Sequence, residues 1–141
     1  GVPDGATLLG RRLGELARIR EIKMEKVDGK ICLVDDFPRD TTLLLVEDFC
    51  TRGTGFAEAA REIVAKHPWV YFVHFDPVII NRGGMKDVVV EGVGTFRILP
   101  IVEKRINDWT PEECPLCRMG SKPIKPKATD ENWLAITTSQ Q

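Results

Sequence analysis

The chain has 141 residues, 43% of them hydrophobic and 29% charged, which is enough apolar material for one compact domain with its own core. Its net charge of −1 and its pI of about 6.2 argue against nucleic acid or a membrane surface as the main partner. No apolar run approaches the ~20 residues that cross a bilayer, and no signal peptide is visible. The cytoplasm is therefore the expected compartment.

The N-terminal segment combines a short loop with an amphipathic helix. Leu8, Leu9, Leu13 and Leu16 recur at a spacing of three to four, which predicts a helix after the loop formed by residues 1–7. A loop that begins a helix normally follows a strand in a doubly wound sheet, and no strand precedes this one. We therefore expect the sequence to be the C-terminal part of a longer domain. A short protein with a flexible N-terminus is the less favoured alternative.

Residues 20–34 have the pattern of a β-hairpin. Apolar and charged residues alternate, Asp28-Gly29 marks a turn, and a second apolar arm follows. The first arm carries Lys23 and Lys26. These lysines either form the solvated face of an edge strand or lie above an anionic ligand.

Residues 43–55 carry the most specific pattern in the chain. Four apolar residues predict a buried strand, Glu47 and Asp48 follow at its end, and a loop then leads into a helix predicted over residues 56–66. In open α/β sheets, ligands bind outside the carboxyl ends of the strands. The backbone N–H groups of such a loop, together with the helix dipole, form an anion site. Gly53 would let the backbone approach a phosphate closely, and Thr51 would add a hydroxyl donor.

The two acids narrow the choice of ligand. A carboxylate next to a phosphate would repel it, so Glu47 and Asp48 are expected to hold the vicinal hydroxyls of a ribose. A ribose 5-phosphate lying across the strand end fits this arrangement. A Walker loop does not fit, because no Gly-Lys-Ser/Thr follows, and the Gly-x-Gly-x-x-Gly dinucleotide pattern is also absent. The plainer alternative is an ordinary strand–turn–helix with acids near the helix start.

The strand, the acid pair and the loop together resemble the signature of the type I phosphoribosyltransferases. The resemblance implies an α/β fold with a doubly wound, mainly parallel sheet flanked by helices, a β-hairpin loop and an irregular C-terminal tail. In that family the acids hold the ribose hydroxyls of phosphoribosyl pyrophosphate, and the loop holds its 5-phosphate. By resemblance, the sugar-phosphate ligands are Glu47, Asp48, Thr51, Arg52, Gly53, Thr54 and Gly55, and the pyrophosphate ligands are Pro3, Asp4 and Gly5. Gly55 departs from the family, which often has Ser or Thr at this position.

Two further segments resemble the orotate branch of the family. Orotate phosphoribosyltransferases carry a mobile Arg-Lys-x-x-Lys-x-His loop, and residues 22–26 preserve both of its lysines, although Ile22 replaces the Arg and no His follows. Their base site uses a loop Thr and the Arg of an Asp-Arg pair, which match Thr51 and Arg82, with Asn81 in place of the acid. An Arg suits a planar carboxylate because its fork donates two parallel hydrogen bonds. Arg82 as a solvated turn residue is the equally weighted alternative.

We divide the chain into a core, residues 1–108, and a C-terminal tail, residues 109–141. Residues 69–75, 88–90 and 95–102 have the apolar, β-branched character of strands. The tail string at residues 111–120 is similar to tails of some bacterial and archaeal orotate phosphoribosyltransferases. It contains Cys114 and Cys117, which have the spacing of half a zinc knuckle, but no second Cys-x-x-Cys or close His pair supplies the other two ligands, and a zinc site is not favoured. Cys32 and Cys50 are expected to be buried thiols.

The resemblance implies transfer of ribose 5-phosphate from phosphoribosyl pyrophosphate to a nucleobase, with orotate favoured, in pyrimidine nucleotide biosynthesis. A homodimer is also implied. Positive charge develops on the sugar ring, where Asp48 would stabilise it, and the leaving pyrophosphate would be neutralised by Mg²⁺, Lys23 and Lys26. The alternative from another class is a non-catalytic phosphoribosyl- or nucleotide-binding regulatory module. A zinc-binding interaction domain built on Cys114 and Cys117 is the most distant alternative.

Overall fold

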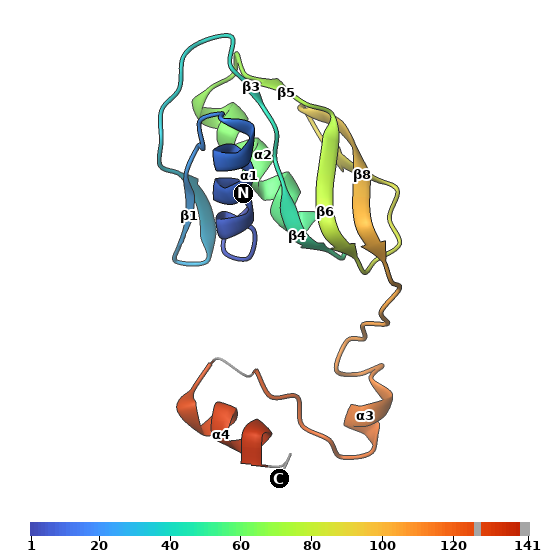
Figure 1. The fold of residues 1–141 in the computed structure, drawn as a ribbon. Coiled ribbons are helices and arrows are strands. Elements are labelled where there is room, and N and C mark those ends of the chain that lie inside the picture. The colour runs from blue at the N-terminus through green and yellow to red at the C-terminus, as the bar shows by residue number, and fades with distance from the viewer. Residues whose placement is uncertain (126–127, 139–141) are drawn as a thin grey trace. The chain divides into compact units, whose positions relative to one another are not determined.

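The computed structural model describes residues 1–125 and 128–138, which form two compact units with a boundary after Ile106 (Figure 1). Of the helices and strands that the structure describes, the first unit holds every strand and two of the helices. Its elements are α1 (Thr7–Ala17), β1 (Met24–Val27), β2 (Lys30–Leu33), β3 (Thr42–Leu43), β4 (Glu47–Cys50), α2 (Thr54–Lys66), β5 (Tyr71–Phe72), β6 (Phe75–Asn81), β7 (Asp87–Val90) and β8 (Gly94–Glu103).

The first unit belongs to the α/β class. Its main sheet has the strand order β4-β6-β8-β7, in which β4 and β8 both run parallel to β6 and β7 runs antiparallel to β8. A second parallel pair joins β3 to β5. Parallel pairing requires crossover connections, and α2 supplies the connection between β4 and the strands that follow it.

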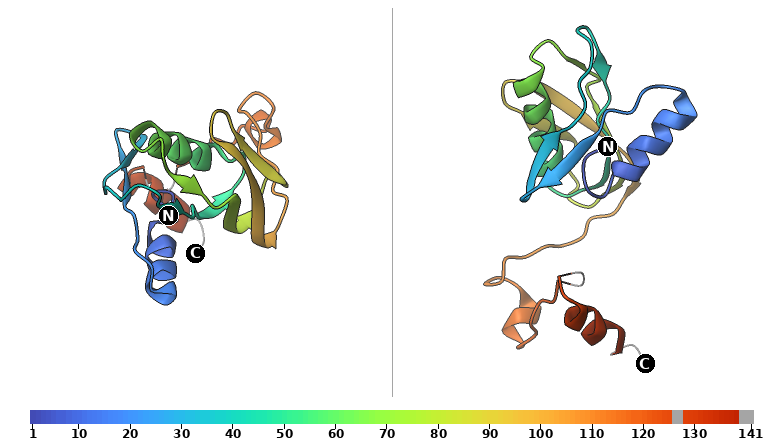
Figure 2. Two further views of the ribbon diagram at one scale, coloured as in Figure 1. Left: turned by 90° about the horizontal axis from the view of Figure 1, so that it is seen from above. Right: turned by 90° about the vertical axis from the view of Figure 1, so that its left-hand side faces the viewer.

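The core lies between the main sheet and α2. The helix buries Phe56, Ala59, Ala60 and Ile63, and the Phe56 ring meets Phe96 of β8 edge-on at 4.8 Å between centroids. Figure 2 shows α2 lying across the strands, with α1 apart from it near residues 41–46. On the main sheet, the large apolar side chains Ile79, Leu99 and Ile101 are exposed.

The segment around the acid pair differs in detail from the expected strand. Leu45 and Val46 are buried as predicted, but the ladder is interrupted between β3 and β4, so Glu47 and Asp48 lie inside β4 instead of following a strand. The Val46 carbonyl accepts a hydrogen bond from the Val2 N–H at 2.9 Å instead of one from a neighbouring strand. The strand expected over residues 69–75 likewise divides into β5 and the start of β6.

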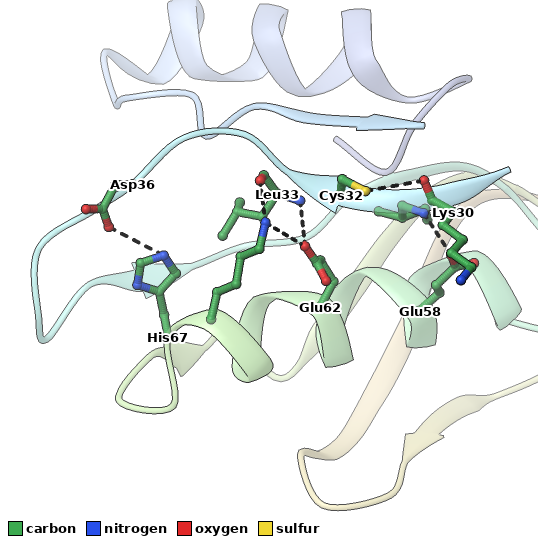
Figure 3. Close-up of polar contacts among 9 residues, drawn as sticks. Lys30, Cys32, Leu33, Asp36, Glu58, Glu62 and His67 are labelled. Carbon is green, nitrogen blue, oxygen red and sulfur yellow. Dashed lines mark hydrogen bonds and ion pairs between the residues drawn. The ribbon is translucent and has the colours of Figure 1, made fainter. Parts of the chain in front are cut away.

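The hairpin formed by β1 and β2 confirms the Asp-Gly turn prediction. Val27 pairs with Lys30, and the two turn residues both have positive φ, 50° at Asp28 and 80° at Gly29, as a type I′ turn requires. The free edge of β2 faces α2. There the side chains of the helix take the place of another strand (Figure 3).

Two carboxylates of α2 accept backbone hydrogen bonds from the edge of β2. Glu58 Oε1 lies 2.8 Å from the Ile31 nitrogen, and Glu62 Oε1 lies 3.0 Å from the Leu33 nitrogen (Figure 3). Lys66 Nζ donates to the Leu33 carbonyl at 2.8 Å and also pairs with Glu62. We call this set of contacts the edge clamp. It fixes the hairpin against the helix without any strand pairing.

The second unit begins at Asn107 and contains α3 (Pro115–Arg118) and α4 (Asp130–Thr138). The expectation of an irregular tail is therefore wrong in part. Thr129 Oγ1 accepts the Asn132 N–H at 3.1 Å, which is an N-cap contact, and Asp130 and Glu131 occupy the first turn of α4. No helix in the described part of the chain is both long and apolar enough to cross a membrane.

Candidate functional site

The loop between β4 and α2 is formed as a backbone cradle. Gly53 sits at the N-cap of α2 with a φ of 64°, a left-handed conformation that glycine adopts without strain. A Cβ at this position would lie 2.6 Å from Cγ2 of Val88, so the loop packs tightly on β7. The Gly53 carbonyl accepts the Ala57 N–H at 2.9 Å and starts the helix. The N–H groups at the start of α2 are thereby fixed beside residues 51–55.

A cleft of about 230 Å³ opens next to this cradle. It is lined by Arg52, Gly53 and Thr54 on one side and by Arg61, Met85 and residues of β7 on the other. Arg52 precedes the start of α2 and Arg61 lies in the second half of that helix, so the cleft is lined by two arginines. A larger apolar cleft of about 450 Å³ lies between α1 and residues 41–46 and is lined by none of the residues predicted to bind ligand.

The N-terminal loop lies against Asp48. A Cβ built on Gly5 would collide with the Asp48 carboxylate, so only glycine lets the loop approach this side chain. The loop is held by the Val2 bond to Val46 and by the Ala6 N–H, which donates to the Val2 carbonyl at 3.1 Å. The peptide bond between Pro3 and Asp4 is cis. The structure therefore brings together two segments that the sequence predicted to share one ligand.

The two acids of the pair point into different surroundings. Asp48 is half-buried, and its Oδ1 accepts the Phe49 N–H at 2.9 Å. Glu47 is buried, with 6% of its surface exposed, and it accepts the Phe56 N–H from the first turn of α2. Burial, and next the Asp76 carboxylate, raise the pKa of Glu47 to about 8.

Asp76 and Cys50 complete a buried cluster with Glu47. Their ionisable atoms lie within 4.8 Å of one another, and Asp76 is fully buried. Burial raises the pKa of Asp76 to about 7, and burial followed by the Glu47 charge raises the pKa of Cys50 to about 12. Cys50 is therefore a buried thiol, as the sequence predicted, and its raised pKa makes it a poor nucleophile near neutral pH. Sequence reasoning missed Asp76, whose one signal is an acid inside an apolar strand.

Thr51 and Arg82, the two residues that match the base site of the orotate branch, are in contact with each other. The Thr51 hydroxyl accepts hydrogen bonds from Arg82 Nε at 3.1 Å and from Nη2 at 2.8 Å. The guanidinium also lies over the Phe49 ring, 5.3 Å from its centroid. The Arg82 N–H donates to the Cys50 carbonyl at 2.7 Å, which places this residue at the end of β4.

Asn81, the residue that replaces the usual acid, closes the turn after β6. Its amide donates to the Met85 carbonyl at 2.8 Å, and its carbonyl oxygen accepts the Gly84 N–H at 3.1 Å. A carboxylate has no donor for the first of these bonds. The buried Asn81 therefore suits this turn, and the departure from the family pattern has a local structural reason.

The two lysines predicted to be catalytic lie on the hairpin. Both are exposed, and Lys23 lines a cleft of about 170 Å³ together with Thr7 and Arg11 of α1. The Lys23 N–H donates to Asp35 Oδ2 at 3.0 Å, which closes the base of the hairpin. No contact recorded among the described residues brings Lys26 to the acid pair.

Cys114 and Cys117 lie in the second unit, Cys114 at the N-cap of α3 and Cys117 within that helix, and both are free thiols. The pKa of Cys114 is lowered, chiefly because the Cys117 N–H donates to its sulfur. In the part of the chain that the structure describes, no group of three or more metal-ligating side chains includes either cysteine.

The chain combines an α/β sheet, an acid pair in β4 and a glycine-bearing loop at the start of α2, and comparison with known proteins shows what it is similar to. The chain is 30% identical over 132 residues to an orotate phosphoribosyltransferase of Wolinella succinogenes, covering 86% of this chain and 63% of that protein. An orotate phosphoribosyltransferase of Nitratiruptor sp. gives 30% over 132 residues, with 86% and 64% covered. The one from Heliobacterium modesticaldum gives 30% over 137 residues, with 89% and 66% covered.

These findings confirm the resemblance to the type I phosphoribosyltransferase family, and within it to the orotate phosphoribosyltransferases. The chain spans just under two thirds of the length of these relatives. No protein-family model matches it.

Proposed function

We propose that the chain belongs to a phosphoribosyltransferase that moves ribose 5-phosphate from phosphoribosyl pyrophosphate to orotate, in pyrimidine nucleotide biosynthesis. The observation that carries the proposal is the contact between the N-terminal loop and Asp48. It brings the N-terminal loop against the carboxylate that we assign to the sugar, and the loop that we assign to the 5-phosphate follows this residue along the chain. The names of the relatives support orotate as the acceptor.

The residues would divide the work along the substrate. The backbone N–H groups of residues 51–55 and the start of α2 hold the 5-phosphate. Asp48 accepts hydrogen bonds from the ribose hydroxyls and stabilises the positive charge that develops on the ring as pyrophosphate departs. The loop of residues 3–5 receives the pyrophosphate, and the exposed Lys23 and Lys26 offset its charge.

Mg²⁺ fits this scheme as a cation carried by the substrate. The loop residues Asp4 and Gly5 are exposed, so a pyrophosphate bound there stays open to water. Mg²⁺ keeps several waters and is commonly held by substrate phosphates, so no side chain of this chain is assigned as its ligand. When bound, it supplies counter-charge to the leaving group.

On the base side of the proposed site, the Thr51 hydroxyl orients the Arg82 guanidinium. Its two donors point at one hydroxyl, and a planar carboxylate that replaced this hydroxyl would accept both. We further propose the doubly wound arrangement of the family for the complete domain. A cytoplasmic homodimer is proposed as its working form, to be tested by sedimentation.

The test is a calorimetric titration with phosphoribosyl pyrophosphate and Mg²⁺, repeated with orotate, uracil and hypoxanthine, with pyrophosphate release as the activity readout. We expect sugar-phosphate binding that orotate alone enhances. Asp48→Asn should weaken that binding about tenfold or more, because a hydrogen bond to a charged group contributes about 1.5–3 kcal/mol. The matched control is Glu91→Gln, an exposed acid in the turn between β7 and β8.

Three results would contradict the proposal in different ways. Unchanged affinity in Asp48→Asn would remove the sugar-binding role from this residue. Binding without a response to any base would favour the regulatory module. No binding by the folded chain would refute the assignment of residues 43–55.

A further inference from the structure

Two buried carboxyls face one another in the core beneath the proposed site. Asp76 of β6 is fully buried, and among the residues that the structure describes neither of its oxygens has a hydrogen-bond partner; the same holds for Oε2 of Glu47 in β4. The ionisable atoms of Glu47, Asp76 and Cys50 lie within 4.8 Å of one another. Two bare carboxylates at this separation offer only acceptors to each other, so a hydrogen bond between them requires a proton.

In the described part of the chain, no cation is found to compensate the charge of this pair. From β4, the groups that act on it are the Cys50 thiol and the Asp48 carboxylate, both of which are acids, and from α2 the Phe56 N–H donates to Glu47. No cationic side chain is among the groups that shift the pKa of either carboxyl. A buried, unpaired negative charge is costly, and two adjacent ones are more so, which favours retention of a proton.

We infer that Glu47 and Asp76 share a proton inside the sheet, and that Asp76 is thereby a positioning residue that keeps Glu47 turned toward the start of α2. Of the two neighbouring acids Glu47 and Asp48, Asp48 is then the one that contacts the sugar. The link to the sugar rests on the proposed function, whereas the shared proton does not. Asp76 lies five residues before the turn that holds Asn81, so it belongs to the interior of β6 and not to the ligand-facing edge.

The direction of both pKa shifts agrees with this arrangement. Burial and then the Asp76 charge raise the pKa of Glu47 to about 8, and burial raises that of Asp76 to about 7. Because the two groups interact, the protons leave in two steps that belong to the pair. Near neutral pH the pair holds about one proton. Above pH 8 a second charge enters the core beside the cradle.

The shared proton makes the fold sensitive to alkali. The folded chain keeps protons that the unfolded chain releases near the ordinary values of 3.8 and 4.5. Stability is therefore greatest below those values, falls as the pH rises toward the raised folded values, and levels off above them. Each extra proton held by the folded state raises the unfolding constant about tenfold per pH unit in this window.

The experiment follows the carboxyl carbons of Glu47 and Asp76 by NMR from pH 4 to pH 10 and measures urea unfolding over the same range. Asp76→Asn replaces one carboxyl by an amide that donates permanently to Glu47. We expect both carboxyls to titrate well above their ordinary values. The variant should lose about a tenfold change in unfolding constant per pH unit between pH 5 and pH 7, relative to the unmodified chain. Glu91→Gln should keep the original slope.

Titration of both carboxyls near their ordinary values would overturn the inference, and so would an Asp76→Asn variant with an unaltered pH slope. If that variant does not fold, the NMR titration of the unmodified chain decides alone. Ribose 5-phosphate affinity, measured at each pH, separates the two proposals. Raised titration without sugar-phosphate binding would support the shared proton and contradict the proposed function. If both proposals are correct, the Asp76→Asn variant should bind ribose 5-phosphate up to a higher pH than the unmodified chain does.

Discussion

The contact between Thr51 and Arg82 gives a quantitative test of the base side of the site. We would remove the hydroxyl with Thr51→Val and the guanidinium with Arg82→Met, singly and together. One hydroxyl accepts two bonds from a charged donor, at 2.8 and 3.1 Å. A hydrogen bond to a charged group contributes about 1.5–3 kcal/mol, but both residues are half-buried and water replaces part of it. We therefore expect a coupling of about 1 kcal/mol.

The assay measures the urea unfolding of the unmodified chain, the two single variants and the double variant. Unfolding is monitored through the NMR signals of core amides in the first unit. The lost stacking of Arg82 on Phe49 is present in both arms of the cycle and cancels. Thr42→Val, a change at an exposed position of β3, is the matched control and should show no coupling to Arg82. Coupling below about 0.3 kcal/mol, the usual error of additivity, would show that the contact does not form in solution. That result would also refute the argument that Thr51 orients Arg82 to bind a carboxylate.

Three further outcomes are expected. Gly53→Ala should destabilise the chain by about 2 kcal/mol, because the residue has a φ of 64° and Val88 Cγ2 leaves no room for a Cβ. Gly92→Ala is the control, with a φ of 76° but open space around it, and should cost about 1 kcal/mol in the same urea assay. Equal losses would contradict tight packing of the loop on β7. The Leu33 N–H, and next Lys66, lower the pKa of Glu62, so its stabilisation is present above the ordinary pKa and disappears as the pH falls through the lowered value. Glu62→Gln should accordingly speed hydrogen exchange at Leu33 at neutral pH and change it little in acid, and a pH-independent effect would count against the carboxylate. Lys26→Ala should slow pyrophosphate release far more than it weakens orotate binding, and equal effects on both would reduce its role to general electrostatics.

The parts of the fold with local signals were predictable. The spacing of leucines located α1, the Asp28-Gly29 pair located the hairpin, and the apolar runs located β7 and β8. The family pattern singled out Thr51 and Arg82 as residues of one site, and the structure places them in contact with each other. In each case the information lies within a few neighbouring residues or in a known motif.

The features that were missed depend on contacts between distant segments. The bond from Val2 to Val46 interrupts the ladder beside the acids, and no local pattern announces it. Asp76 acquires its character only because β6 pairs with β4 and carries the side chain under Glu47. In the tail, the cap formed by Thr129 was a local signal that the prediction of an irregular segment overlooked.

The edge clamp has a consequence for how the chain behaves among other chains. An unpaired strand edge is a template on which a second molecule can add a strand, and a two-stranded hairpin has two such edges. On β2 the outward donors of Ile31 and Leu33 are already taken by carboxylates of α2, and Lys66 takes the Leu33 carbonyl. An incoming strand would have to displace charged side chains before it formed its first bond. The side chains of α2 thus hinder intermolecular strand addition at the edge of β2. The other edge of the hairpin is β1, which carries an exposed lysine.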